Sequence, residues 1–96
     1  MTGVLDTLTT MTSRSLTITV KLFAAYQEAY GVPEVTWNFP VGTPVSAVLD
    51  RCATDYPELQ KWRELTRFGV NLQFVTPETP LRDGDEVVLI PPVSGG

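Results

Sequence analysis

One stretch of this sequence has the spacing of a long amphipathic helix, and it limits the folds that the chain can adopt. Between Pro44 and Pro57 the apolar residues recur every three or four positions, so they fall on one helical face. This stripe consists of Val45, Val48, Leu49, Cys52, Ala53 and Tyr56. Thr43 is expected to cap the helix, with Pro44 at its first position, where a backbone amide is not needed. A single helix of this length can cover only one face of a sheet.

The segment before this helix predicts two strands joined by a short connection. Apolar and polar residues alternate strictly over 16–22, which is the pattern of a strand with one face in a core. A short helix is expected over 24–30, where Gly31 suits the left-handed position after a helix end. Over 35–39 the large apolar residues again share one parity, which predicts a second strand. Strands this close in sequence favour an antiparallel pair.

The segment after the helix predicts further strands. Residues 68–75 are expected to form two short strands around a turn, and 86–90 form an apolar last strand after the turn-rich loop 79–85. Residues 58–66 fit either a short helix or a loop, with Trp62 closing one edge of the core. This order of elements predicts an α+β domain of the ubiquitin-like β-grasp type, with a mixed sheet of about four to five strands packed on one main helix.

Composition excludes several classes of function. The 96 residues carry a net charge of −4, which argues against nucleic acids or an anionic membrane as partners, because these select for clustered Lys and Arg. Histidine is absent and Cys52 is the single cysteine, so His-assisted nucleophiles, zinc clusters and disulfides are not expected. No apolar run approaches the roughly 20 residues that cross a bilayer. We therefore expect a cytoplasmic protein of one domain, without a metal site and with Cys52 packed in its core.

The two ends of the chain differ from the expected domain over 15–90. Residues 1–14 are rich in threonine and have no usable period, which predicts a disordered extension. Residues 91–96 predict an extended, flexible tail that begins with a Pro-Pro pair and ends in Gly-Gly. Because glycine has no Cβ, the end of such a tail can enter a narrow channel in another protein.

The last third of the chain contains a compound motif. The loop Leu81-Arg82-Asp83-Gly84-Asp85-Glu86-Val87 leads into the apolar last strand, which continues into Pro91-Pro92-Val93-Ser94-Gly95-Gly96. Leu22-Phe23-Ala24-Ala25 and Val70-Asn71 add to the pattern. Together these segments resemble the small subunit of molybdopterin synthase, the MoaD family of ubiquitin-like sulfur carriers in the MoaD/ThiS superfamily. The resemblance extends over 16–96.

The resemblance implies a sulfur carrier in molybdenum cofactor biosynthesis, with no catalytic residues and no bound cofactor. An E1-like adenylyltransferase of the MoeB type would use ATP to adenylate the carboxylate of Gly96, and a sulfur donor would convert it into a thiocarboxylate. The large subunit of molybdopterin synthase, of the MoaE type, would receive the tail in its active site and pass the sulfur to a pterin precursor, within a heterotetramer. The tail residues that would enter these partner enzymes are Pro91, Pro92, Val93, Ser94, Gly95 and Gly96.

The sheet face that a single helix leaves uncovered is expected to meet a partner. Phe23 lies on the polar side of its strand, although packing under a loop is an alternative. One parity of the last strand also faces outward, either Val88 with Ile90 or Val87 with Leu89. The resemblance adds a large-subunit contact at position 74, for which a core role is the alternative. The predicted partner surface consists of Phe23, Phe74, Val88 and Ile90.

Other functions fit the same tail or the same domain. Related sulfur carriers for thiamine or cysteine synthesis also end in Gly-Gly. A ubiquitin-like protein modifier would use the same adenylated Gly96 to acylate a lysine of another protein. A noncovalent β-grasp interaction module would need no free terminus, so blocking the terminus distinguishes it from the covalent alternatives.

Overall fold

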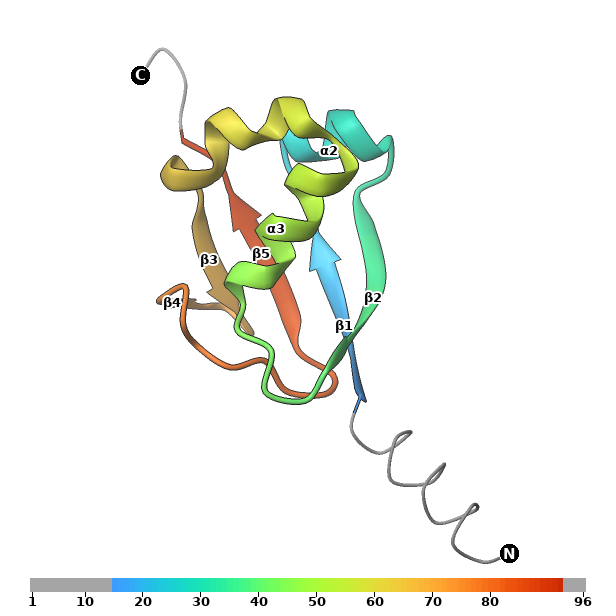
Figure 1. The fold of residues 1–96 in the computed structure, drawn as a ribbon, viewed down its shortest axis with the longest axis vertical. Coiled ribbons are helices and arrows are strands. Elements are labelled where there is room, and N and C mark those ends of the chain that lie inside the picture. The colour runs from blue at the N-terminus through green and yellow to red at the C-terminus, as the bar shows by residue number, and fades with distance from the viewer. Residues whose placement is uncertain (1–14, 93–96) are drawn as a thin grey trace, which may run out of the picture.

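Helices cover one face of a mixed five-stranded sheet in the computed structural model, which describes residues 15–92 (Figure 1). The strands are β1 (Ser15–Lys21), β2 (Glu34–Pro40), β3 (Arg67–Val70), β4 (Gln73–Val75) and β5 (Glu86–Ile90). Their order in the sheet is β2-β1-β5-β3-β4. The neighbours β1 and β5 are parallel, and the other neighbouring pairs are antiparallel. This arrangement confirms the predicted α+β fold of the ubiquitin-like β-grasp type.

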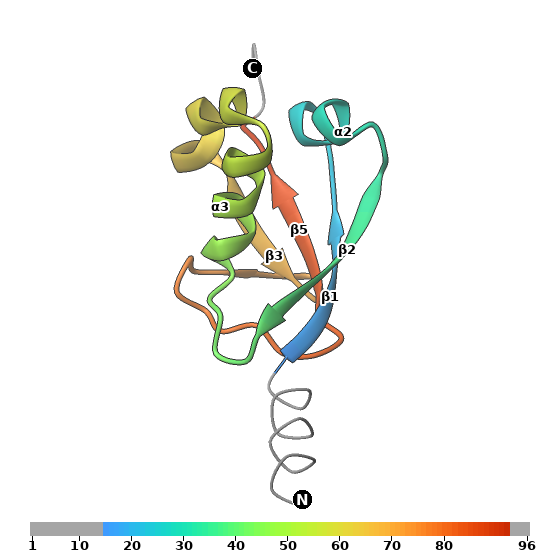
Figure 2. The ribbon, with the colours of Figure 1, turned by 45° about the vertical axis from the view of Figure 1, so that its right-hand side comes forward.

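In the described part of the chain, two α-helices and a 3-10 helix connect the strands. α3 (Ser46–Asp55) lies along one face of the sheet and η1 (Pro57–Leu65) follows it, whereas α2 (Ala25–Tyr30) lies near one end of the sheet (Figure 2). Gly31, at a φ of 73°, ends α2 as predicted, and its amide donates to the carbonyl of Gln27. The long helix that the sequence predicts is therefore the one that covers the sheet.

Hydrogen bonds hold the segment 58–66 against α2. The sequence alone allowed either a short helix or a loop for this segment. η1 occupies most of this segment, and Leu59 is buried. The hydroxyl of Thr66 donates to the carbonyl of Trp62 (2.8 Å), so the hydroxyl of Tyr26 must donate in its 2.5 Å contact with Thr66. The indole of Trp62 packs against the core. These contacts tie the end of η1 to α2.

The core lies between α3 and the inward face of the sheet. Trp37 of β2 is buried there, as the parity of its strand predicts. The fully buried side chains are Ile18, Val20, Leu22, Tyr26, Val45, Val48, Cys52, Val87 and Leu89. Burial of each aliphatic side chain of this size contributes about 1.5 to 3 kcal/mol. Because Val87 and Leu89 point inward, the other parity of β5, with Val88 and Ile90, faces outward.

α3 begins two residues later than predicted, and the prediction that Thr43 caps it is wrong. The helix starts at Ser46 without a side-chain cap. The hydroxyl of Thr43 instead donates to the carbonyl of Pro40 (2.6 Å). The amides of Val45 and Ser46 donate to two carbonyls of the loop 76–80, at 2.8 and 3.1 Å. Because these acceptors lie about thirty residues further along the chain, no local pattern reveals how the helix start is satisfied.

The Asp83-Gly84-Asp85 motif fastens the loop before β5 to its neighbours. Buried Asp85 accepts hydrogen bonds from the side-chain amide of Asn71 and from the backbone amide of Arg82, each at 2.8 Å. Asp83 accepts one from the backbone amide of Thr17 (2.8 Å). The two carboxylates therefore join this loop to β1 and to the turn between β3 and β4.

Asp85→Ala is expected to lower the free energy of unfolding by about 3 kcal/mol, because it removes two part-buried hydrogen bonds to a charged acceptor. A denaturant melt measures the change. Asp83→Ala is the control in the same loop: its carboxylate is exposed, and we expect a loss of about 1 kcal/mol. Equal losses in the two variants would contradict the role assigned to Asp85.

Candidate functional site

The uncovered face of the sheet divides into a polar half and an apolar half. On the polar half, formed by β1 and β2, outward side chains pair with one another. Thr17 donates to Asn38 (2.7 Å), and Lys21 donates to Glu34 (2.5 Å). The hydrogen bond with Glu34 raises the pKa of Lys21, so this side chain stays positively charged. Two pairs of outward polar side chains on this half therefore bind each other within the domain.

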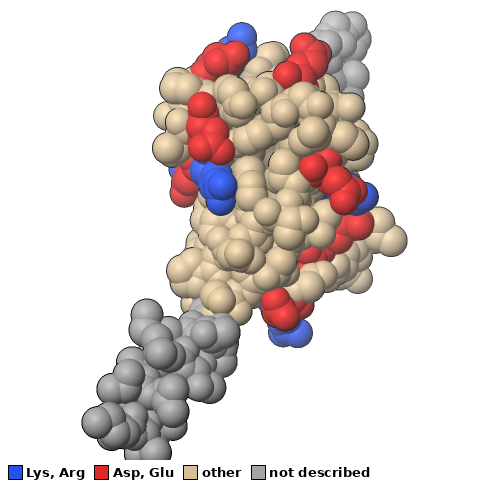
Figure 3. Space-filling model, turned by 90° about the vertical axis from the view of Figure 1, so that its right-hand side faces the viewer, with Lys and Arg blue, Asp and Glu red and all other residues tan. Residues whose placement is uncertain are grey.

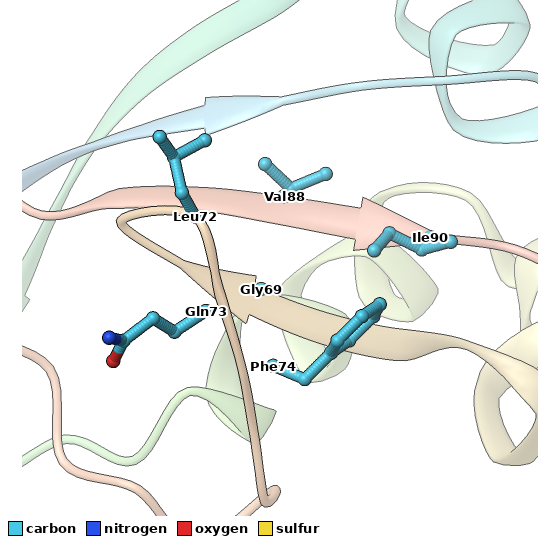
Figure 4. Close-up of a pocket in the computed structure, with 6 residues that line it drawn as sticks. All are labelled: Gly69, Leu72, Gln73, Phe74, Val88 and Ile90. Carbon is cyan, nitrogen blue, oxygen red and sulfur yellow. The ribbon is translucent and has the colours of Figure 1, made fainter.

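The apolar half, formed by β5, β3 and β4, contains a shallow groove of about 210 Å³ that is open to solvent. We call it the outer groove. Its lining residues are Gly69, Leu72, Gln73, Phe74, Val88 and Ile90 (Figure 4). Phe74 and Ile90 lie side by side, whereas the side chain of Gln73 points away from them (Figure 4). Exposed apolar surface of this kind is typical of a site that binds another protein.

Strand register explains why the outer groove is hollow. Gly69 of β3 pairs with Val88 of β5 on one side and with Phe74 of β4 on the other. Because Gly69 has no side chain, the space between its two neighbours stays open. A Cβ at this position would lie 3.7 Å from the Cβ of Val88, which is an ordinary van der Waals distance. Gly69 therefore gives the groove its depth.

A two-residue turn with an unusual backbone closes one end of the outer groove. Asn71 and Leu72 connect β3 to β4 with φ angles of 50° and 70°. Positive φ at both positions is the mark of a type I′ hairpin turn, in which glycine is favoured as the second residue. The side chain of Asn71 bonds to Asp85 and to the amide of Glu86, which fixes the turn against β5. Leu72 is 90% exposed.

The C-terminal tail leaves the domain at the other end of the outer groove. β5 ends at Ile90, which lines the groove, and the partly buried Pro91 and Pro92 follow it without regular secondary structure. The predicted tail residues Val93, Ser94, Gly95 and Gly96 lie outside the described residues. At about 3.3 Å per residue, the six residues after β5 can reach about 20 Å at most. A protein that holds residue 96 must therefore come close to the outer groove.

The structure brings together three of the four residues predicted to form the partner surface. Phe74, Val88 and Ile90 line the outer groove, and Phe74 is 74% exposed, so its alternative core role is wrong. Phe23 is 49% exposed, so it does not pack under a loop, but it is not among the residues that line the groove. That a partner binds these residues stays a prediction.

Three residues of the outer groove, Gly69, Leu72 and Gln73, were not identified from the sequence as part of a partner surface. Leu72 was expected at the start of a strand, whereas it lies in the turn; the preceding Asn71, which tolerates positive φ, is the signal that could have placed it there. Gly69 was expected only as part of a strand. A glycine inside a short strand often marks a close approach of another chain, and this signal was available.

The described residues offer little reactive chemistry of their own. Burial raises the pKa of the Cys52 thiol to about 11, so it is protonated at neutral pH and is a poor nucleophile. Within residues 15–92, no group of three or more His, Cys, Asp or Glu side chains could hold a metal ion. None of the helices in this same range is long and apolar enough to pass through a membrane.

Charged side chains on the face shown in Figure 3 stand in separate groups. Acidic groups lie around the margin of this face, some with a basic group beside them, and uncharged residues fill its centre. Two of the ion pairs within residues 15–92, which the figure does not label, join Arg63 to Asp50 and Arg51 to Asp55. Exposed pairs of this type contribute about 1 kcal/mol or less. The charges on this face therefore form no concentrated binding site.

Comparison with known proteins identifies the family. The model of the ThiS family matches residues 20–96. An Arabidopsis thaliana protein named molybdopterin synthase sulfur carrier subunit is 34% identical over 82 residues, which cover 85% of this chain and 85% of that protein. A Mycobacterium tuberculosis protein of the same name is 37% identical over 81 residues, which cover 82% of this chain and 96% of that protein.

Solved structures agree with this assignment. A Pyrococcus furiosus protein described as a molybdopterin converting factor subunit 1 superposes with a TM-score of 0.70 at 26% identity, covering 81% of this chain and 99% of that one. Small archaeal modifier protein 1 from Methanosarcina acetivorans superposes with a TM-score of 0.67 at 29% identity, covering 85% of this chain and 98% of that one. The chain belongs to the ThiS family, and within it to the MoaD group of molybdopterin synthase sulfur carrier subunits.

Proposed function

We propose that this chain carries sulfur for a molybdopterin synthase on the carboxylate of Gly96. The observation that supports this most directly is the extent of the family match, which runs to residue 96 and so includes the Gly-Gly end. The described domain adds a second support. Its apolar outer groove leads to Ile90, directly before the tail, so a partner that binds the groove is well placed to receive the tail.

Activation of the tail takes two steps in this proposal. In the E1-like adenylyltransferase of the MoeB type, an oxygen of the Gly96 carboxylate attacks the α-phosphate of ATP, and pyrophosphate leaves. A donor sulfur at the oxidation level of sulfide then attacks the acyl carbon, and AMP leaves with the oxygen that joined it. The product is a thiocarboxylate. Activation is needed because a terminal carboxylate, with an ordinary pKa of about 3.5, is ionised and a poor electrophile at neutral pH.

The large subunit, of the MoaE type, then performs the transfer. The sulfur of the thiocarboxylate attacks a carbon of the pterin precursor and displaces an oxygen substituent of that carbon, which takes up a proton as it leaves. Water then cleaves the acyl–sulfur bond. The sulfur stays on the pterin, and the chain regains its carboxylate. This chain supplies the cargo and the docking surface, while the catalytic groups and the ATP belong to its partners. We expect a heterotetramer with one copy of this chain at each end.

The tail has the physical properties that this cycle requires. Pro91 and Pro92 favour an extended backbone with little conformational entropy to lose, which suits a segment that must carry a reactive end into a partner enzyme. Gly95 and Gly96 lack a Cβ, so two different enzymes can admit the backbone through narrow channels. The absence of a reactive thiol in the domain also agrees with a carrier whose reactive atom is at the terminus.

A protein-modifier function is the second candidate, and the likeness to small archaeal modifier protein 1 favours it. Both functions begin with the adenylate of Gly96, and they differ in the acceptor. Carriers for thiamine or cysteine synthesis differ only in the molecule that receives the sulfur. Incubating the thiocarboxylated chain with the large subunit and pterin precursor separates these functions. Sulfur on the pterin and a regenerated carboxylate support the proposal, whereas an unchanged thiocarboxylate, with lysine conjugates in cell extract, would support the modifier.

Cys52→Ala is expected to leave sulfur loading unchanged, because the buried, protonated thiol takes no part in it. We expect a stability loss of about 1 to 2 kcal/mol, since the truncation leaves a small cavity beside α3. Intact-mass analysis measures the loading, and a thermal melt under the same conditions confirms that the variant is folded. A folded variant that no longer loads sulfur would show that Cys52 acts as a sulfur relay.

A further inference from the structure

Neither the turn nor the core explains why residue 72 is a leucine. Its φ of 70° lies in the left-handed region, where an L-residue with a side chain pays about 1 to 2 kcal/mol relative to the right-handed region. Glycine or asparagine would relieve this strain. Leu72 is also 90% exposed, so its side chain buries almost nothing within the domain. A strained backbone that gives the domain no stabilising contact in exchange points to a function for the residue.

The turn that carries Leu72 is fixed on the side of Asn71. The backbone amide of Asn71 donates to the carbonyl of Glu86 (2.9 Å), and its side chain accepts from the amide of Glu86 (3.0 Å). The same side chain donates to buried Asp85 (2.8 Å), which the amide of Arg82 also contacts. Leu72 is therefore presented on an ordered support, and little backbone entropy remains to be lost when a partner binds it.

Leu72 lies at one end of the outer groove, and Ile90, the last residue before the tail, lies at the other (Figure 4). The length of the tail beyond the described residues limits what can cover this surface. Residues 93–96 can reach only about 13 Å beyond Pro92 at about 3.3 Å per residue. The protein that holds residue 96 must therefore sit over the end of β5, next to the groove.

We propose that Leu72 is a preformed apolar anchor for the protein that receives Gly96, and that it inserts into an apolar pocket of that protein. The occupant is the large subunit, so this inference rests on the proposed function. Leu72 fixes one end of the contact and the tail fixes the other, with the outer groove between them. A leucine that is already held in its bound conformation loses less entropy on binding than a mobile leucine, so it contributes more affinity. The free chain keeps Leu72 in this conformation at the expense of backbone strain.

The test compares the affinity and the thermal stability of the same variants. Full-length Leu72→Gly and Leu72→Asn are titrated with the purified large subunit of molybdopterin synthase from the same organism, and each free chain is melted. We expect the Kd to rise about tenfold, which corresponds to loss of one apolar anchor. We expect the Tm of the free chain to rise by a few degrees, since strain is relieved. Val41→Ala, another exposed apolar residue in the turn after the edge strand β2, is the control and keeps the parent Kd.

Opposite changes in affinity and stability are the signature of an anchor, because a residue with only a structural role would not weaken binding while the domain becomes more stable. A parent-like Kd in both Leu72 variants would overturn the inference and leave the proposed function intact. Failure of the parent chain to bind the large subunit would count against the proposed partner itself. A fall in Tm would overturn the inference by showing that another part of this chain covers Leu72. Loss of a dimer in sedimentation, with unchanged Kd, would overturn it in favour of a second copy.

Discussion

Adding one alanine after Gly96 is expected to reduce sulfur loading by at least about 100-fold, while the melting temperature of the domain stays unchanged. The extra residue moves the carboxylate by about 3.3 Å and places a Cβ at the reacting end, and misplacement of even about 1 Å can cost a reaction about 100-fold. The domain is unaffected because the tail begins after the last strand. The rate is measured by intact-mass analysis during incubation with the activating enzyme, ATP and a sulfur donor.

The matched control adds the same alanine at the other end of the chain, before Met1. This variant has the same composition and is expected to load sulfur at the parent rate. If the chain extended at Gly96 also loaded at the parent rate, the terminal carboxylate would not be the reacting group. A noncovalent interaction module would then be the better account.

Phe74→Asp is expected to weaken binding of the large subunit by about 30- to 1,000-fold, the range of a hot-spot residue. The ring is 74% exposed in the free chain, so its removal costs the domain little. In the complex, the new carboxylate would have to be buried in the outer groove beside Val88 and Ile90 without a polar partner. Calorimetric titration of the large subunit measures the change in Kd.

Thr36→Asp is the control for Phe74→Asp. Thr36 is exposed on β2, on the polar half of the same sheet face. The substitution therefore introduces the same charge on the same face of the sheet, but outside the outer groove. We expect its Kd to stay within about threefold of the parent value, as for a residue outside the hot spot. Similar losses in both variants would mean that overall charge, and not the outer groove, controls binding.

Much of the fold follows from local patterns. Strict alternation over 16–22 predicts which side of β1 faces the core, and the apolar stripe from Val45 to Tyr56 predicts the helix that covers the sheet. Gly31 ends α2 as its neighbours predict, because the left-handed position after a helix is a local requirement. These elements are predictable because each depends on residues close together in sequence.

Features that depend on distant residues were not predictable. Residues on both faces of β5 are apolar, so the sequence allowed either Val87 with Leu89 or Val88 with Ile90 to face outward. In the structure Val87 and Leu89 are buried in the core, so Val88 and Ile90 face outward. The outer groove exists only because β3 lies between β4 and β5 with Gly69 in register with Val88. The type I′ turn at Asn71 and Leu72 has a local signal in Asn71, but the contacts that hold this turn in place join Asn71 to Asp85 and Glu86, more than ten residues away.

The central claim, that Gly96 carries sulfur, is tested most directly by the mass of the intact chain. The chain is incubated with an E1-like adenylyltransferase of the MoeB type, ATP and a sulfur donor, and fragmentation of the product locates the change. The account predicts replacement of one oxygen by one sulfur, confined to the terminal carboxyl of Gly96. An unchanged mass, with an activating enzyme that loads its own known carrier in parallel, would contradict it.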